Sequence, residues 1–108
     1  MLTELGLQVL LAVGRGAAHG YAIGKDIEER TGGRLDPSTG ALYQALKRLA
    51  DEGLVRPASA PRHEEVDARR KYFELTPSGR RAVTAEIRRL ESLVELARER
   101  KLYPAGGR

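Results

Sequence analysis

The most regular pattern of apolar and polar positions in the chain lies between Leu35 and Gly53. Four apolar residues recur there at the spacing of one helical face: Leu42, Ala45, Leu46 and Leu49. Asp36 and Pro37 are typical of a helix start, as the N-cap and the first helical residue. Gly53 followed by Leu54 is typical of a helix stop. The stretch is therefore predicted to be a short helix with one buried face.

The opposite face of this predicted helix is rich in groups that can bind DNA. Hydroxyls, an amide, an aromatic ring and a cation can bond phosphate oxygens and base edges. We expect the DNA-facing residues to be Ser38, Thr39, Tyr43, Gln44 and Lys47. For Tyr43 a second interpretation stays open, in which its ring packs against the preceding helix.

A helix is also predicted over residues 3–15, where apolar side chains leave almost no polar face. A helix that is apolar all round must be covered on more than one side, and the core of so small a protein covers only one. We therefore predict that Leu5 and Val9 contact a second copy of the chain. The alternative, which the sequence leaves open, is packing in a groove of the same chain.

A second helix is predicted over residues 21–30, where Ile23 and Ile27 lie one turn apart. Tyr21 is predicted to be a core residue whose hydroxyl finds a partner. His19 has no second His or Cys near it in the sequence. A role at a helix start or in a loop is therefore favoured over metal binding or acid–base chemistry.

The chain that follows the Leu35–Gly53 stretch has the pattern of a β-hairpin. Residues 54–57 read as a short strand blunted by Pro57, residues 58–68 as a polar loop, and residues 69–75 as the return strand. A hairpin placed after two helices joined by a turn makes a wing beside the second helix. The pattern thus predicts a winged helix-turn-helix.

Three cations stand at the start of the predicted return strand, and they are Arg69, Arg70 and Lys71. We predict that they contact DNA phosphates, which supply much of the affinity in such domains. The alternative is a strand start that only improves solubility. The same loop holds Glu64, Glu65 and Asp67, which phosphates would repel, so the sequence leaves open whether the wing loop touches DNA.

The last predicted helix begins at Thr76 and Pro77 and runs to about Tyr103. Its apolar residues are spaced as in a coiled coil: Val83, Ile87, Leu90, Val94 and Ala97. No later element can cover them, so we predict that they form the interface of a homodimer. Residues 104–108 are predicted to be a tail.

The composition fits one globular domain with an anionic partner. The chain has 108 residues, 41% of them hydrophobic, a net charge of +4 and a sequence pI of about 9.8. There is no Cys, which excludes disulfides and agrees with a reducing compartment. We see no signal peptide and no apolar run long enough for a membrane, and we expect a cytoplasmic protein without membrane contact.

The sequence also lacks the motifs of an enzyme. There is no phosphate-binding glycine loop, no nucleophile elbow and no metalloprotease motif. The two histidines, His19 and His63, lie far apart, in or beside loops. We therefore predict no catalytic residue, no metal site and no cofactor.

Four stretches, taken together, resemble the PadR family of transcriptional regulators, in its short form with a single C-terminal helix. They are His19-Gly20-Tyr21-Ala22-Ile23, Gly40-Ala41-Leu42-Tyr43 continued by Ala45-Leu46-Lys47-Arg48-Leu49, Glu52-Gly53-Leu54-Val55, and Arg70-Lys71-Tyr72-Phe73-Glu74-Leu75-Thr76-Pro77-Ser78-Gly79-Arg80. The resemblance implies a winged helix-turn-helix homodimer, joined by its terminal helices, that binds a palindromic operator and usually represses. It also implies that Tyr43 touches the DNA backbone, and that a small aromatic or drug-like molecule can release the DNA.

Two features depart from the family pattern. Gln44 stands where many relatives have Pro, which puts the base preference in question. Aromatic residues make up only 5% of the chain and Trp is absent, so an aromatic effector is not assumed.

The sequence as a whole predicts a mainly α fold with a small β-hairpin. We expect a winged helix-turn-helix in residues 1–75 and a C-terminal dimerisation helix in residues 76–103, as one structural unit. The predicted function is a sequence-specific repressor that binds double-stranded DNA. Two rivals stay open: a winged-helix protein-interaction module that never touches DNA, and a regulator that has no small-molecule effector.

Overall fold

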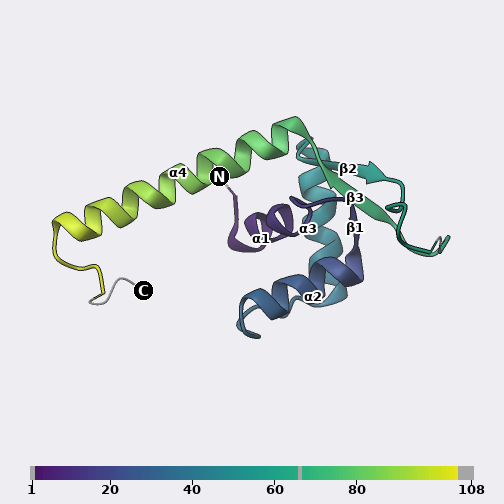
Figure 1. Cartoon of the computed structure of the whole chain (residues 1–108), viewed down its shortest axis with the longest axis horizontal. Coiled ribbons are helices and arrows are strands. Elements are labelled where there is room, and N and C mark those ends of the chain that lie inside the picture. The colour runs from purple at the N-terminus through teal and green to yellow at the C-terminus, as the bar shows by residue number, and fades with distance from the viewer. Residues whose placement is uncertain (1, 66, 105–108) are drawn as a thin grey trace.

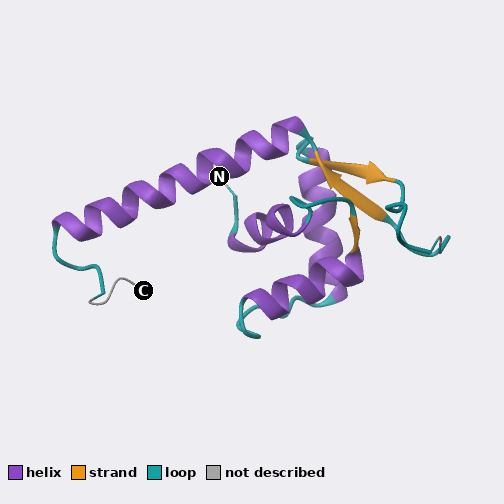
Figure 2. Cartoon of the chain, in the orientation of Figure 1, coloured by secondary structure: helices purple, strands orange, loops and turns teal. Residues whose placement is uncertain are grey.

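The computed structural model describes residues 2–65 and 67–104, and it shows a helical body from which one long helix projects (Figure 1). In chain order the elements are α1 (Glu4–Ala12), β1 (Ala18–His19), α2 (Gly20–Arg30), α3 (Thr39–Asp51), β2 (Val55–Ala58), β3 (Tyr72–Leu75) and α4 (Pro77–Glu99). The strands form one antiparallel sheet in the order β1-β3-β2 (Figure 2). The predicted mainly α fold with a hairpin is confirmed. Residues 105–108 of the predicted tail lie outside the described residues.

The core lies where α1, α2 and α3 pack on one another and on the sheet. Its largest fully buried side chains come from each of these elements: Val9, Leu10, Val13, Ile23, Ile27, Leu46 and Val55. The prediction that Val9 contacts a second chain is wrong, because Val9 is 0% exposed within its own chain and belongs to the core cluster. Leu5 also packs against this core but stays partly exposed. In α1 the exposed large apolar residue is Leu11, at 40%.

The start of α3 differs from the sequence prediction. Ser38 is the N-cap, and its Oγ accepts the backbone N–H of Ala41 at 3.1 Å. Asp36 and Pro37, predicted as the cap and the first helical residue, precede the helix. Asp and Ser are both favourable N-cap residues, so composition alone did not distinguish the two positions.

The end of α3 is as predicted. Gly53 has a φ of +77°, a conformation that favours glycine. Its N–H donates to the carbonyl of Ala50 at 2.9 Å, and the N–H of Leu54 donates to that of Leu49 at 2.9 Å. These two bonds are the Schellman stop, and they turn the chain directly into β2.

The sheet contains one strand that the sequence analysis missed. In β1, Ala18 and His19 pair with Phe73 and Tyr72 of β3. A strand of two residues is too short to show alternation, which explains the omission. Pro57 lies inside β2 and is tolerated there because β2 is an edge strand.

A tight junction joins α4 to the body. The Thr76 hydroxyl donates to the carbonyl of Gly53 at 2.6 Å and accepts the N–H of Gly79 at 2.9 Å. The Thr76 N–H donates to the carbonyl of Leu54 at 3.1 Å. Gly79 lies so close to that carbonyl that a Cβ atom would clash with it, and it would lie 2.7 Å from a methyl of Leu75. The direction in which α4 leaves the body is therefore fixed.

Beyond this junction α4 extends away from the body (Figure 1). Gly79 is its buried residue, whereas Ile87, Leu90 and Val94 are 39%, 37% and 38% exposed. The helix ends at Glu99, four residues before the predicted end at Tyr103. Lys101 adopts a positive φ of 58° and the N–H of Leu102 donates to the carbonyl of Ala97 at 2.8 Å, which closes a Schellman stop without a glycine.

Candidate nucleic-acid interface

The predicted recognition helix, α3, divides sharply into a buried and an exposed face. Leu42, Ala45, Leu46 and Leu49 are buried. The predicted DNA-facing set is exposed and occurs together on one side of the helix and at its N-terminal tip: Ser38, Thr39, Tyr43, Gln44 and Lys47. Gly40 lies among them and its missing side chain leaves open space. The helix therefore offers an exposed, largely polar surface with open space at Gly40.

Tyr43 lies against the start of α2. A Cβ atom added to Gly20 would clash with the Tyr43 hydroxyl and would lie 2.7 Å from Cζ. The ring therefore packs on Gly20, as the second interpretation of the sequence predicted. It nevertheless remains 39% exposed. Packing and DNA contact are compatible here, because Tyr43 packs on Gly20 and still keeps part of its surface exposed.

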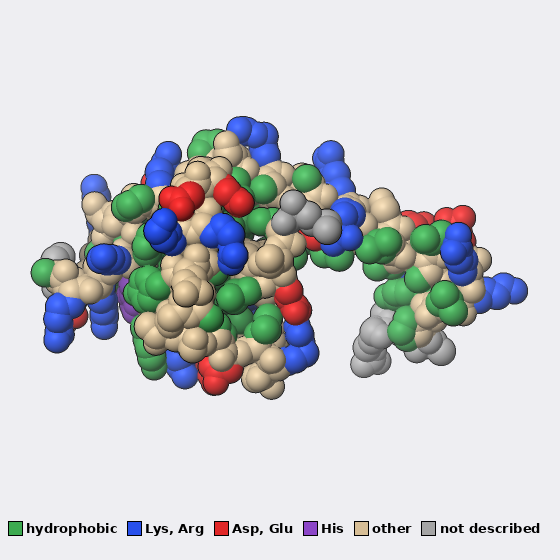
Figure 3. Space-filling model, turned by 180° about the vertical axis from the view of Figure 1, so that it is seen from behind, with side chains coloured by type: hydrophobic (Ala, Val, Ile, Leu, Met, Phe, Trp, Pro, Cys, Tyr) green, Lys and Arg blue, Asp and Glu red, His purple; other side chains and the backbone are tan. Residues whose placement is uncertain are grey.

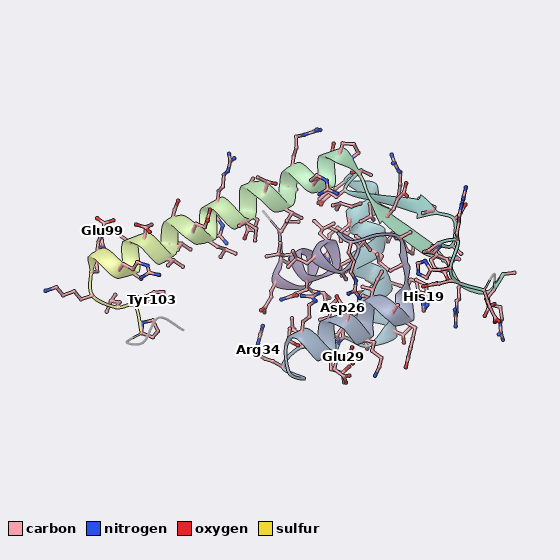
Figure 4. All side chains as sticks on the ribbon, in the orientation of Figure 1. His19, Asp26, Glu29, Arg34, Glu99 and Tyr103 are labelled. Atoms are coloured by element: carbon pink, nitrogen blue, oxygen red, sulfur yellow. The ribbon has the colours of Figure 1, made fainter. Side chains whose placement is uncertain are left out.

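The N-terminal end of α2 borders the same surface. His19 caps this helix, since its Nδ1 accepts the N–H of Ala22 at 3.3 Å, which confirms a helix-start role. Its ring is 8% exposed and meets Tyr72 edge-on at 5.3 Å between centroids. Figure 4 shows His19 at the junction between the sheet and α2.

Tyr21 is a residue of this surface that the sequence analysis misplaced. It was predicted in the core but is 75% exposed. With Lys25 it lines a groove of about 500 Å³ between α2 and α3, next to Tyr43 and Thr39. Two steps along a helix rotate a side chain by about 200°, so Tyr21 lies opposite the buried face of Ile23. That offset was the signal that could have placed it outside.

Lys47 is partly neutralised by its own helix. Its Nζ lies 3.1 Å from Asp51 Oδ2, and its side chain is 78% exposed. An exposed pair one turn apart is weak, about 0.3–0.5 kcal/mol. A phosphate can therefore replace Asp51 as the partner of Lys47 at small cost.

The predicted wing cations lie in a loop, because the return strand begins at Tyr72 and not at Arg69. Asp67 causes this: its Oδ1 accepts the N–H of Arg69 at 2.9 Å, and its carbonyl accepts that of Arg70 at 3.0 Å, so the chain turns. The side chain of Arg69 also bonds Asp67, at 3.2 Å and 3.3 Å. These hydrogen bonds hold the pKa of Asp67 below its ordinary value.

A second acidic residue of the wing is tied to the sheet. The Tyr72 hydroxyl donates to Glu64 at 2.6 Å, and this bond raises the pKa of Tyr72. Two of the three wing carboxylates thus have partners in the wing itself. Lys71 is exposed, and no ion pair within 4 Å is found for it among residues 2–65 and 67–104.

Charge elsewhere on the surface is spread out. Seen from behind, Lys and Arg side chains occur along α4 as well as over the body, mixed with acidic groups (Figure 3). Within the described part of the chain, His, Asp and Glu residues form no group of three that could hold a metal. None of its helices has the length and apolar character to cross a bilayer.

Comparison with known proteins agrees with this geometry. Residues 9–85 match the family described as "Transcriptional regulator PadR-like family". An uncharacterized 37.1 kDa protein in transposon TN4556 of Streptomyces fradiae is 42% identical over 85 residues, which cover 79% of this chain. The matched segment is only 22% of that relative's own length.

Solved structures share the fold. H. salinarum RosR is 30% identical, with a TM-score of 0.70 over 86% of this chain and 77% of that one. A PadR family transcription regulator from Clostridium difficile is 19% identical, with a TM-score of 0.74 over 90% and 97%. Bacillus subtilis PadR in complex with operator DNA is 24% identical, with a TM-score of 0.65 over 79% and 47%. The chain thus has the winged-helix fold of these regulators and belongs to the PadR-like family of transcriptional regulators.

Proposed function

We propose that this chain is a homodimeric repressor that binds an inverted-repeat operator through α3. The observation that carries the proposal is the exposed polar face of α3, in which Tyr43 is seated on Gly20 and flanked by Thr39 and Lys47. Bacillus subtilis PadR, which shares the fold, was solved with operator DNA. We assign Ser38, Thr39, Tyr43, Gln44 and Lys47 to the major groove and its phosphates.

The wing has a supporting role in this proposal. Arg69, Arg70 and Lys71 reach the DNA backbone beside the groove that α3 enters. Arg69 and Arg70 exchange Asp67 for phosphate when DNA binds. Glu64 is held by the Tyr72 hydroxyl and does not have to approach the backbone.

The dimer is formed by α4 together with the exposed side of α1. Leu11, Ile87, Leu90, Leu93, Val94 and Leu96 are each between 37% and 50% exposed, and Figure 3 shows apolar side chains along the outer part of α4. A second copy would cover them. Val83, predicted as a dimer contact, is half-buried because it packs against the core of its own chain, and Ala97 is half-buried beside this surface. Two α3 helices related by a two-fold axis would then enter successive major grooves about 34 Å apart.

The proposal is tested by titrating the chain into labelled DNA from upstream of its own gene, beside a scrambled duplex, at two salt concentrations. We expect saturable binding to the native duplex in steps of two chains, with a clear preference over the scrambled one. Equal binding to both duplexes that fades together with salt would contradict the proposal, because it would report only net charge. A protein partner that binds the α3 face would point instead to an interaction module.

A further inference from the structure

A groove on the far side of the hairpin from the wing loop is lined by arginines. It has a volume of about 730 Å³ and lies where β2, the end of β3 and the first half of α4 meet. Its arginines are Arg56, Arg80, Arg81 and Arg88. Apolar side chains and two hydroxyls complete the lining, and they are Leu75, Pro77, Ala85, Thr76 and Thr84.

The groove is separate from the proposed DNA surface. It adjoins β2, which follows the C-terminal end of α3, whereas Thr39 and Tyr43 lie in the N-terminal half of that helix. A helix of 13 residues is about 20 Å long, so most of the length of α3 lies between the groove and Thr39, whereas Lys47 lies one turn before the C-terminal end. A ligand in the groove would leave the N-terminal half of α3 free for DNA.

The groove lies beside the proposed dimer surface. Arg80, Thr84 and Arg88 follow one another at intervals of one turn and share one face of α4. Ile87 of the apolar seam is three residues from Thr84 and seven from Arg80, so it borders that face. The lining of the groove also includes Arg56 of β2 and Leu75 of β3, which do not belong to the seam.

The charges of the groove are mostly uncompensated. Arg56 pairs with Glu74 across the hairpin, with Nε and Oε2 2.6 Å apart. Within the described ranges 2–65 and 67–104, Arg80, Arg81 and Arg88 have no carboxylate within 4 Å, although Arg81 donates to Ser78 at 3.0 Å. Arginines gathered in a concave site without acidic partners are suited to a multiply charged anion.

We propose that this groove binds a small molecule that carries two or more phosphate or carboxylate groups. The guanidinium groups of Arg80 and Arg88 bind the acidic groups in bidentate fashion, and Leu75 and Ala85 contact the carbon skeleton. Arg56 joins them by releasing Glu74. Because Arg56 belongs to the wing hairpin and the other arginines to α4, the bound anion links these two elements. Binding is measurable on the protein without DNA, so it does not depend on the proposed function.

The test is isothermal titration of the full chain with inorganic pyrophosphate and, separately, with citrate. We expect saturable binding of at least one probe to the original chain. Each of the single variants Arg80→Ala and Arg88→Ala should weaken that binding about tenfold to a hundredfold, and the double variant should weaken it further. The matched control is the double variant Arg98→Ala with Arg100→Ala, which loses the same charge at the far end of α4 and should bind as the original chain does. Absence of saturable binding by both probes would overturn the proposal, and so would equal weakening in the two double variants.

DNA itself is the other candidate occupant, and the same variants distinguish it. We expect the Arg80→Ala and Arg88→Ala double variant to keep the operator affinity and the salt dependence of the original chain. If the double variant lost operator affinity and salt dependence, and the original chain bound neither pyrophosphate nor citrate, the groove would belong to the DNA surface and the proposal would be overturned. Failure of the proposed function looks different, because the original chain would then bind the anion but not the operator.

Discussion

The body formed by α1, α2, α3 and the sheet differs from α4 in how far its apolar residues are buried. In the body, Val9, Ile23 and Ile27 are 0% exposed, so that the chain covers its own apolar surface. In α4 the apolar residues are equally regular, yet Leu90, Leu93 and Leu96 are 37%, 50% and 40% exposed. The same helical spacing of apolar residues therefore forms a core where other elements surround the helix, and an exposed apolar face where the helix extends beyond them.

The contrast shows which part of the chain can be stable alone. Isolated helices gain little stability from propensity and depend on packing of the apolar face. The body has that packing within one chain, whereas α4 contacts the body near Thr76 and Gly79 and through Val83, and its later residues Leu90 and Val94 stay exposed. In the proposed dimer, the second copy would cover the apolar residues of α4, as the sheet and the helices of the body cover one another's apolar residues.

The largest expected effect is on this seam. Leu90→Asp would place a carboxylate in the interface of both chains, where its desolvation costs several kcal/mol. We expect the dimer to dissociate about a thousandfold more readily and operator binding to fall with it, while the body stays folded. Sedimentation equilibrium measures the change. Ser92→Asp adds the same charge on the opposite side of α4 and should leave the dimer intact; equal dissociation of both variants would contradict the seam.

A core substitution in the body should act on folding instead. Leu46 is 1% exposed, so Leu46→Ala leaves a cavity and should lower the free energy of unfolding by about 2–5 kcal/mol. Denaturant unfolding measures it. Gln44→Ala, on the exposed side of the same helix, should change that free energy by no more than about 0.5 kcal/mol. Similar losses for the two would mean that α3 is not divided into a core face and an open face.

A smaller effect is expected where the body positions Tyr43. In Gly20→Ala the new methyl would displace the end of the Tyr43 side chain, which can move without disrupting the core. We expect operator affinity to fall about tenfold, as for one lost charged hydrogen bond, with little change in unfolding. Gly24→Ala is the control, since its Cβ would lie at an ordinary 3.5 Å from Leu42. Unchanged affinity in Gly20→Ala would remove Tyr43 from the interface.

Lys47 of α3 should affect salt dependence more than specificity. Lys47→Ala removes one phosphate contact per chain, so the slope of log affinity against log salt should fall by about one per chain. Anisotropy titrations over a series of salt concentrations measure it, on both native and scrambled duplexes. The loss should be similar on both duplexes, and an unchanged slope would show that Lys47 stays with Asp51.

The smallest effect is expected from an exposed ion pair of the body. The side chain of Arg34 donates to Glu4 at 2.7 Å and holds the pKa of Glu4 below its ordinary value of 4.5. A lowered carboxyl pKa stabilises the fold above that ordinary value, and the contribution is lost as the pH falls through the folded-state pKa. Glu4→Gln should therefore be slightly less stable than the original chain at about pH 7, and urea unfolding should show the difference shrinking as the pH falls below 4.5. Glu86→Gln, which loses the pair with Arg89 inside α4, should show the same sign.

The features that the sequence predicted correctly are those that a pattern within one segment specifies. The stripe of Leu42, Leu46 and Leu49 defined α3 and its exposed face, and Gly53 defined its end. The hairpin and the long last helix were also predicted, because alternation and the coiled-coil spacing are properties of a single segment. The family resemblance rested on these same segments.

What the sequence could not show depends on contacts between segments. Val9 has the same apolar character as a dimer contact, and only the packing of the other elements of its own chain makes it a core residue. Tyr43 and Gly20 are distant in sequence, so no spacing rule joins them. The turn at Asp67 and the pairing of β1 with β3 likewise come from hydrogen bonds whose donors and acceptors no periodicity reveals.

The junction at Thr76 and Gly79 has a consequence for the evolution of operators in this family. If two copies join through α4, the angle at which α4 leaves the body sets how far apart the two α3 helices lie. The side chains of α3 would then determine the base preference, and Gly79, which lies outside α3, would determine the spacing of the half-sites. A side chain at position 79 would have to displace the Leu54 carbonyl, and the changed angle of α4 would alter the distance between the two α3 helices.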